Sequence, residues 1–220
     1  MGGIIKSSVA RKFAMALSGL FLVFFLLQHF TINFTSVISP DIFNELSHFM
    51  GTNFVVQALL QPVLIFGVIF HFIMGFILEI QNRNARGVGY KNYNGNANSS
   101  WMSRNMIYSG AVILAFLGLH FYDFWFPEIS HKYIHGLPED PTRYYEETIV
   151  KFKDLWRVIL YVVSFIFLML HLLHGFASSF QSVGFNNKYS KGLQGFTKAF
   201  AIIIPLGFIF IALFHYINQL

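Results

Sequence analysis

The sequence predicts an all-α integral membrane protein whose five transmembrane helices form one bundle. Hydrophobic residues make up 55% of the 220 positions and charged residues only 11%, and the mean hydropathy of +0.55 is too high for a water-soluble domain. The apolar residues gather in five segments of about 20 residues or more, the length that a helix needs to cross the hydrocarbon core. Because the connections are short, we expect a single membrane domain, 1–220. The expected spans are approximately 13–38, 54–80, 106–126, 157–181 and 196–217.

The first span follows a short basic segment, Met1 to Lys12, and so superficially resembles a signal peptide. Its apolar run, from Phe13 to about Ile38, is longer than the roughly 7–15 residues of a signal-peptide core, and no small-residue cleavage site follows it. We therefore expect this segment to be retained as the first transmembrane helix.

Basic residues mark one side of the predicted bundle. Lys and Arg precede the first span and gather between spans two and three and between spans four and five, whereas 39–53 and the C-terminal tail contain neither. The positive-inside rule therefore predicts a cytoplasmic N-terminus and a C-terminus outside. The connection 127–154 is mixed in sign, and 142–156 within it is expected to form a short interfacial helix. Residues 90–100, rich in Asn, Gly and Ser, predict a cytoplasmic loop. The net charge of +5 thus reports membrane topology and does not indicate nucleic-acid binding.

Each of the first four predicted spans contains histidine, and the chain has no cysteine. Without cysteine, disulfides and iron–sulfur ligation by this chain are excluded, so a redox centre would depend on histidine or methionine. A histidine in hydrocarbon is costly and indicates a functional site with a partner nearby. His29 lies in the first span and His120 in the third. The second and fourth spans each contain a copy of one histidine pattern. That pattern recurs one hundred positions apart, as His71-x3-Gly75-Phe76-x4-Gln81 and His171-x3-Gly175-Phe176-x4-Gln181.

Helix direction converts sequence position into depth, because a helix rises about 1.5 Å per residue. His29 and His120 lie in the later, outer halves of spans that run outward, whereas His71 and His171 lie in the later, inner halves of spans that run inward. Pairing by depth joins His29 with His120 near the outside and His71 with His171 near the inside. Two imidazoles are a suitable axial ligand set for b-type haem, so the pairs predict two haem b sites with these four histidines as iron ligands.

His174 is an alternative ligand, because it lies three residues after His171 on a neighbouring part of the same helical face. The repeat selects His171, and His174 occupies the place of Met74. Gly75 and Gly175, one turn beyond the inner histidines, would let the flat macrocycle approach the helix backbone, although glycine in a membrane helix also serves helix packing. The other histidines are expected in outer connections or at the outer end of the last span, with ordinary interfacial solvation: His48, His131, His135 and His215.

Five spans with histidine in the first four, the run Leu26-Leu27-Gln28-His29-Phe30 and the H-x3-G-F block of the fourth span together resemble the dihaem cytochrome b membrane anchor of succinate dehydrogenases and fumarate reductases. The resemblance covers the chain from about Arg11 to Tyr216 and is closest to the single-chain, five-helix type with two haems. It implies a subunit of the bacterial cytoplasmic membrane that has no dicarboxylate active site of its own. It also implies His29 and His120 as ligands of the outer haem and His71 and His171 as ligands of the inner haem.

The resemblance further implies partners and a route for electrons. An iron–sulfur subunit and a flavoprotein subunit would dock on the cytoplasmic side, and electrons from succinate would pass through the inner and then the outer haem to a quinone, with menaquinone expected. In this family the quinone site is associated with the outer side. Glu45 is our candidate proton donor to the quinone there, with Asp41, His48 and Asn33 nearby in the sequence. Alternatively, Asp41 and Glu45 only solvate the connection or cap a short helix after Pro40.

Three other interpretations remain open. The chain could anchor a quinol:fumarate reductase, which uses the same wiring in the opposite direction, or another quinone-linked dehydrogenase with different partners. A transporter could instead relay protons along intramembrane histidines. The chain shows no inverted repeat of broken helices, however, and its spans contain almost no acidic residues apart from Glu79 and Asp123 near their ends.

Overall fold

The computed structural model describes residues 7–85, 105–185 and 190–220, and within these ranges the chain is helical, with short turns and no β-strand. The predicted loop 90–100 lies outside the described residues. The described chain contains five helices long and apolar enough to cross a membrane: Ser8–Ile38, Val56–Asn84, Met106–Ile134, Leu155–Ser182 and Lys191–Ile217. The prediction of a helical, multi-pass membrane protein with five candidate spans is confirmed.

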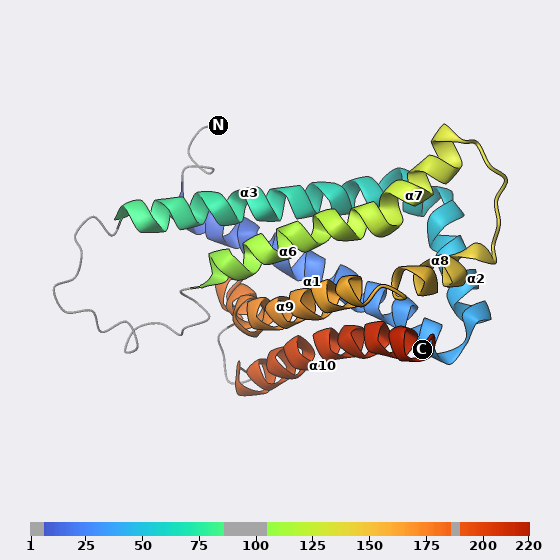
Figure 1. Cartoon of the computed structure of the whole chain (residues 1–220). Helices are drawn as coiled ribbons and strands as arrows, with labels where there is room; N and C mark the ends of the chain where they lie inside the picture. The colour runs from blue at the N-terminus through green and yellow to red at the C-terminus, as the bar shows by residue number, and fades with distance from the viewer. Residues whose placement is uncertain (1–6, 86–104, 186–189) are drawn as a thin grey trace.

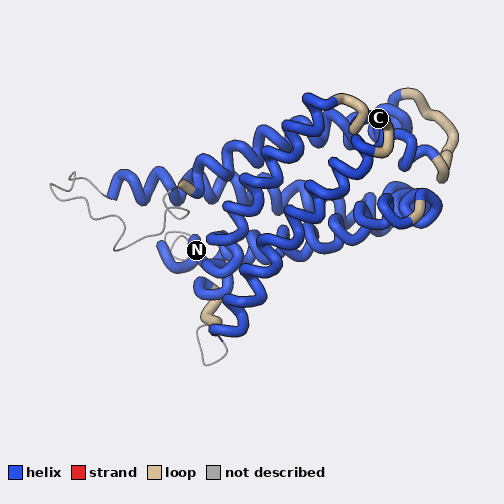
Figure 2. Tube along the Cα trace, turned by 60° about the horizontal axis from the view of Figure 1, so that its bottom comes forward, coloured by secondary structure: helices blue, strands red, loops and turns tan. Residues whose placement is uncertain are grey.

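The long helices run lengthwise through one bundle (Figures 1 and 2). They are α1 (Ser8–Ile38), α3 (Gln61–Ala85), α6 (Met106–His120), α9 (Leu155–Ser182) and α10 (Ser190–Ile217). α3 lies beside α6, α9 lies beside α10, and α1 packs against α3, α9 and α10. α1 begins at one end of the bundle and α10 finishes at the other. We call these the inner end and the outer end, after the predicted orientation.

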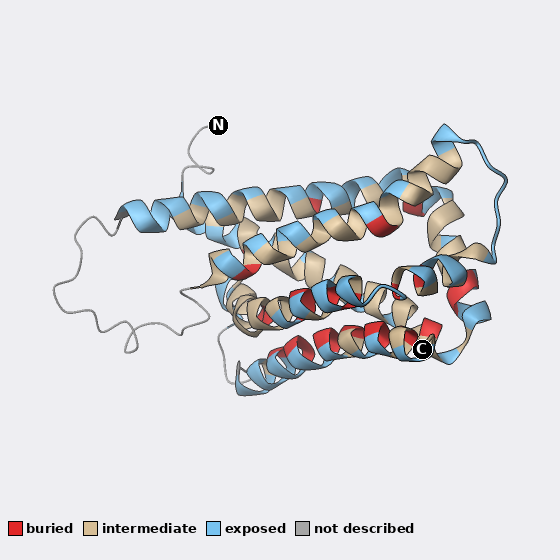
Figure 3. Cartoon of the chain, in the orientation of Figure 1, coloured by how far each residue is buried: buried red, intermediate tan, exposed pale blue. Residues whose placement is uncertain are grey.

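The packed core lies between α9 and α10, where Figure 3 shows most of the buried positions. It includes Tyr161 and Phe165 of α9 with Ala201 and Phe208 of α10. α1 and α3 instead expose large apolar side chains such as Phe24, which is 73% exposed. A continuous apolar surface of this kind suits contact with lipid. Lipid tails are as apolar as these side chains, so facing lipid costs no free energy.

Shorter helices close the outer end: α2 (Pro40–Thr52), η1 (Val56–Leu60), η2 (Phe121–Trp125), α7 (Phe126–Ile129), η3 (Ser130–Ile134) and α8 (Arg143–Lys151). Residues 39–53 therefore form a helix rather than an open loop. Ser39 caps it by accepting a hydrogen bond from the backbone N–H of Ile42 at 3.4 Å, and Pro40 occupies the first turn, where proline is favoured. α8 is a short helix within 142–156, where the sequence predicts one, and its Tyr145 N–H donates to Asn44 Oδ1 of α2 at 2.8 Å.

The third span runs farther than the sequence predicts. The expected end is near 126, but α6 continues through π-helical turns and α7 to Ile134. The two charged side chains of this extension are paired: Lys132 lies 2.5 Å from Glu128 on the same helix and bonds the Gly51 carbonyl of α2, and Arg143 of α8 pairs with Glu128. With these groups satisfied, the helix does not have to end where the apolar run ends. α1 and α10 likewise begin earlier than expected, by between one and two turns.

Candidate functional site

The inner half of the bundle brings together the two histidines of the repeated pattern. His71 of α3 and His171 of α9 face each other, with ring centroids 6.4 Å apart and ring planes at 67°. The two copies of the pattern, one hundred positions apart in the sequence, therefore meet in space. We call these two side chains the inner pair.

A serine hydroxyl lies against each ring of the inner pair. Ser18 Oγ of α1 lies 3.0 Å from His71 Nδ1, and Ser109 Oγ of α6 lies 3.1 Å from His171 Nδ1. Each hydroxyl donates its single hydrogen to a carbonyl one turn earlier, of Met15 and Met106 respectively, at 2.9 Å. Because that hydrogen is already used, each hydroxyl accepts from an imidazole Nδ1–H. Both rings are then held as the tautomer whose Nε2 carries a free lone pair.

Sequence reasoning missed both serines, although a second repeat marks them. The first and third spans share the pattern Met-x2-Ser-Gly-x9-His, and each copy ends at a histidine of the outer half. The copies are Met15-x2-Ser18-Gly19-x9-His29 and Met106-x2-Ser109-Gly110-x9-His120. A Cβ at Gly19 would lie 3.4 Å from His71 Cε1, so this glycine gives the ring room to lie close to α1. The helix pair α1 and α3 thus repeats in α6 and α9.

The outer half holds the other two histidines. The rings of His29 (α1) and His120 (α6) have centroids 5.7 Å apart and planes at 87°. We call them the outer pair. Aromatic side chains surround them: Phe25 stacks on His29 at 5.4 Å, and Phe116 stacks on His120 at 5.8 Å. Four histidines from four helices therefore form the two pairs that depth predicts.

No hydroxyl bonds the rings of the outer pair among the described residues. The Asn33 amide donates to the His29 carbonyl at 2.8 Å and lies 3.4 and 3.5 Å from the ring nitrogens, which is too far for strong bonds. His120 Nδ1 is buried and has no hydrogen-bond partner in the described chain. An unpaired buried ring nitrogen is costly, so the outer site is the less satisfied of the two.

The two pairs lie at different depths along the same helices. On α1, His29 follows Ser18, which contacts the inner pair, by eleven residues, and on α6 His120 follows Ser109 by the same number. At a rise of about 1.5 Å per residue, eleven residues of either helix place the two pairs about 16 Å apart along the bundle. The pairs are thus stacked along the bundle, one in each half.

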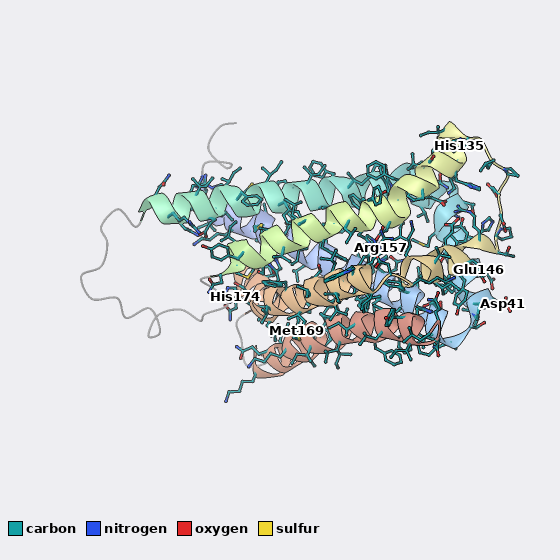
Figure 4. The ribbon with its side chains drawn as sticks, in the orientation of Figure 1. Asp41, His135, Glu146, Arg157, Met169 and His174 are labelled. Carbon is teal, nitrogen blue, oxygen red and sulfur yellow. The ribbon has the colours of Figure 1, made fainter. Side chains whose placement is uncertain are left out.

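A buried carboxylate lies beside the outer pair. Asp123 of η2 is 1% exposed, accepts a hydrogen bond from the Tyr161 hydroxyl at 2.9 Å and lies 3.4 Å from Arg157. The Tyr161 ring is 6.4 Å from the ring of His120. Figure 4 shows Arg157 on α9 toward its outer end. The sequence marks Asp123 only as an acid near a span end and gives no sign of its partners.

His174, Gly75 and Gly175 are the other residues that the sequence predicts near the inner pair. The ring opposite His71 is that of His171, whereas His174 lies nearer the inner end of α9, and no ring contact joins it to His71 in the described chain (Figure 4). A Cβ on Gly75 or Gly175 would meet methionine methyl groups at 3.6 and 3.5 Å, ordinary contact distances, so packing between the helices does not itself demand glycine there.

The outer polar residues divide into exposed and buried groups. Glu45 and Asp41 are exposed on α2 at the outer end, where Figure 4 labels Asp41. His48 Nε2 lies 3.9 Å from Glu139 Oε2. The prediction that His215 is solvated at the interface is wrong: it is 2% exposed, and its Nε2 lies 2.8 Å from the Ser36 hydroxyl. The rings of Tyr145 and Phe152, whose centroids lie 5.7 and 6.3 Å from that of His215, pack against it.

The ring-centroid spacing of both pairs is close to that of two imidazoles bound to one metal. Two metal–nitrogen bonds of about 2 Å, together with the distance from each nitrogen to its ring centre, separate the ring centroids by roughly 6 Å. The observed values, 5.7 and 6.4 Å, lie on either side of this. The described residues contain no group of three or more His, Cys, Asp or Glu that could hold a metal. Two facing imidazoles suit a metal whose remaining ligands come from a macrocycle.

The fold and site together define a helical, multi-pass membrane protein with two intramembrane histidine pairs. No protein-family model, curated protein or solved structure matches the chain.

Proposed function

We propose that this chain is a dihaem cytochrome b, the membrane anchor of a succinate:quinone oxidoreductase in the bacterial cytoplasmic membrane. The observation that supports this most is the meeting of four histidines from four helices as two ring pairs, one in each half of the bundle. In the proposal, His71 and His171 hold the iron of an inner haem b, and His29 and His120 hold the iron of an outer haem b. The N-terminus lies in the cytoplasm and the C-terminus outside.

Two partner subunits complete the proposed enzyme. An iron–sulfur subunit and a flavoprotein subunit dock at the inner end, and the flavoprotein provides the dicarboxylate site that this chain lacks. Bound haem supplies one-electron redox chemistry, which the side chains of this chain do not supply alone. The hydrocarbon core is about 30 Å thick, and two sites about 16 Å apart divide that distance. Membrane quinone, expected to be menaquinone, exchanges electrons with the complex.

The side chains of this chain hold and shield the two sites. In each pair the two histidines come from different helices, and the aromatic rings of Phe25 and Phe116 cover the outer pair. These apolar surroundings exclude water and lower the local dielectric, which tunes the reduction potential of a bound metal group. The buried acceptor Asp123 pairs with Tyr161 and Arg157, and the Tyr161 ring lies 6.4 Å from the ring of His120.

The proposal is tested by purifying the chain with its accompanying subunits, measuring haem per chain and recording a reduced-minus-oxidised spectrum with succinate as the reductant. We expect two b-type haems per chain, reduced by succinate, with flavin present. Two haems without reduction by succinate would instead favour the anchor of another quinone-linked dehydrogenase. A preparation that folds without haem would overturn the ligand assignment and favour proton-relaying transport. The same preparation, supplied with quinol and fumarate, reports whether the reverse reaction is faster.

Glu45 remains the proposed proton donor on the quinone side. Its exposure on α2 at the outer end leaves its carboxyl accessible to a quinone and to water. The Glu45→Gln variant is expected to keep both haems and normal stability, and to lose at least tenfold in quinone turnover, because general acid catalysis contributes about 10²-fold or more. Asp41→Asn is the matched control, an exposed acid on the same helix. Equal turnover in wild type and Glu45→Gln would assign Glu45 to solvation of the helix.

A further inference from the structure

The strongest unexplained feature is the matched pair of serines beside the inner pair. Ser18 and Ser109 come from different helices, yet each presents its hydroxyl to Nδ1 of the facing histidine at 3.0 and 3.1 Å. Each hydroxyl donates to the carbonyl three residues earlier at the same distance, 2.9 Å. The same geometry occurs twice, in two copies of one sequence pattern, so a chance contact is a poor explanation.

These contacts have a defined effect on each imidazole. A serine in an apolar helix usually satisfies itself by donating to its own helix, and Ser164 does so by donating to the Leu160 carbonyl at 2.7 Å. Ser18 and Ser109 make that same bond and still offer a lone pair to a neighbouring ring. A ring that donates Nδ1–H to an acceptor is fixed in orientation and becomes a more basic ligand through Nε2.

We propose that Ser18 and Ser109 are positioning residues of the inner metal site, which orient His71 and His171, assign Nε2 as the ligating nitrogen and lower the reduction potential of the inner haem. The inference rests on the proposed function, because it takes haem to be the group between the rings. The potential falls because a more basic imidazole stabilises the oxidised iron more than the reduced iron. The outer pair has no such hydroxyl in the described chain, so the effect is confined to the inner site.

The test is a redox titration of the purified complex, followed optically, for wild type, Ser18→Ala, Ser109→Ala and the double variant. Each single substitution is expected to raise the midpoint potential of one of the two haems, and the double variant is expected to raise the same one further. A tenfold loss of preference for oxidised iron per serine is of the order expected when such a ligand contact is removed, and for one electron it corresponds to about 59 mV. The potential of the second haem stays at its wild-type value.

Three controls separate positioning from general packing. Ser164→Ala removes a buried serine hydroxyl from the same bundle without touching an imidazole, and it is expected to leave both potentials unchanged. Ser18→Thr and Ser109→Thr keep the hydroxyl and are expected to restore the wild-type potential. Low-temperature electron paramagnetic resonance gives a further readout, because the ferric signal of the inner haem alone should shift with ring orientation.

The outcomes distinguish the inference from the proposed function. Loss of the inner haem in the alanine variants, with retention in the threonine variants, also supports the inference. Unchanged potentials and signals in the double variant, or equal shifts in Ser164→Ala, would overturn it while the haem assignment stands. Absence of haem from the wild-type complex would overturn the proposed function itself.

Discussion

The inner and outer histidine pairs use the same residues in opposite surroundings. The inner rings each donate to a serine hydroxyl at 3.0 or 3.1 Å, whereas the outer rings lie among aromatic side chains, with His120 Nδ1 unpaired in the described chain. The outer pair has instead a buried carboxylate nearby, that of Asp123, which follows His120 by about one helical turn. Because the four ligands are all imidazoles but their hydrogen bonds differ, the imidazoles of the two sites differ in basicity and in how firmly each ring is held. The depth of each histidine along its helix decides which pair it joins, and side chains of neighbouring helices decide which hydrogen bonds its ring makes.

The largest effect is expected when one histidine is removed at a time. His171→Ala is expected to remove the inner haem and His120→Ala the outer haem, so that each variant binds about one haem per chain instead of two, because one imidazole cannot provide both axial ligands. Haem per chain and the absorbance of the remaining haem measure the result. His174→Ala is the matched control and should keep both haems. If His174→Ala lost the inner haem and His171→Ala kept it, the inner ligand would be His174.

The second test removes the carboxylate that distinguishes the outer site. Asp123→Ala leaves the Tyr161 hydroxyl and the partly buried Arg157 without their acceptor, and is expected to lower the free energy of unfolding by about 2 kcal/mol. Thermal unfolding in detergent measures the loss, and the spectrum should change for the outer haem alone. Glu79→Ala breaks an exposed pair with Arg83 and should cost much less, because solvent screens the pair. Equal losses in the two variants would show that burial of Asp123 gives it no special role.

A smaller effect is expected from crowding a residue next to the outer pair. A Cβ at Gly207 would lie 2.6 Å from Phe30 Cζ, and Phe30 directly follows His29. Gly207→Ala should therefore displace the ring and lower the free energy of unfolding by about 1 kcal/mol, since overpacking costs more than the gain in helix propensity. Gly195→Ala, in the same helix with no atom within 4 Å of its Cβ, is the control and should be neutral or slightly stabilising. Thermal unfolding and the outer-haem spectrum compare them.

The smallest expected effect is a response of the outer loop to acid. Hydrogen bonds from the Thr142 side chain and backbone lower the pKa of Asp140 below its ordinary value. A carboxyl with a lowered pKa stabilises the folded loop above its unfolded pKa, and this contribution disappears as the pH falls through the lower, folded pKa. The protection factor of the Thr142 amide, which is its exchange rate relative to that of the unfolded chain at the same pH, should therefore fall only in strongly acidic solution, with no change near neutrality. Asp140→Asn should abolish that pH dependence, and a dependence that survives the substitution would come from another group.

The sequence predicts much of the architecture because membrane helices follow simple rules. Apolar length predicts all five spans, and the fixed rise per residue places His29 with His120 and His71 with His171. The same rules fail at the outer end. Residues 127–134 are polar enough to suggest a loop, yet they stay helical because Lys132 and Glu128 find partners on α2 and α8. Such partners are distant in the sequence and invisible to a hydropathy pattern.

Depth along the bundle was determined by the sequence alone, whereas rotation and neighbours were decided only by the tertiary structure. Hydrophobic length and helix rise place a histidine at a given height, because both are local properties of one segment. Which side of each helix faces which neighbour depends on packing among helices that are far apart in the chain. That packing sets His171 rather than His174 opposite His71, brings Ser18 and Ser109 to the inner rings, and buries Asp123 and His215.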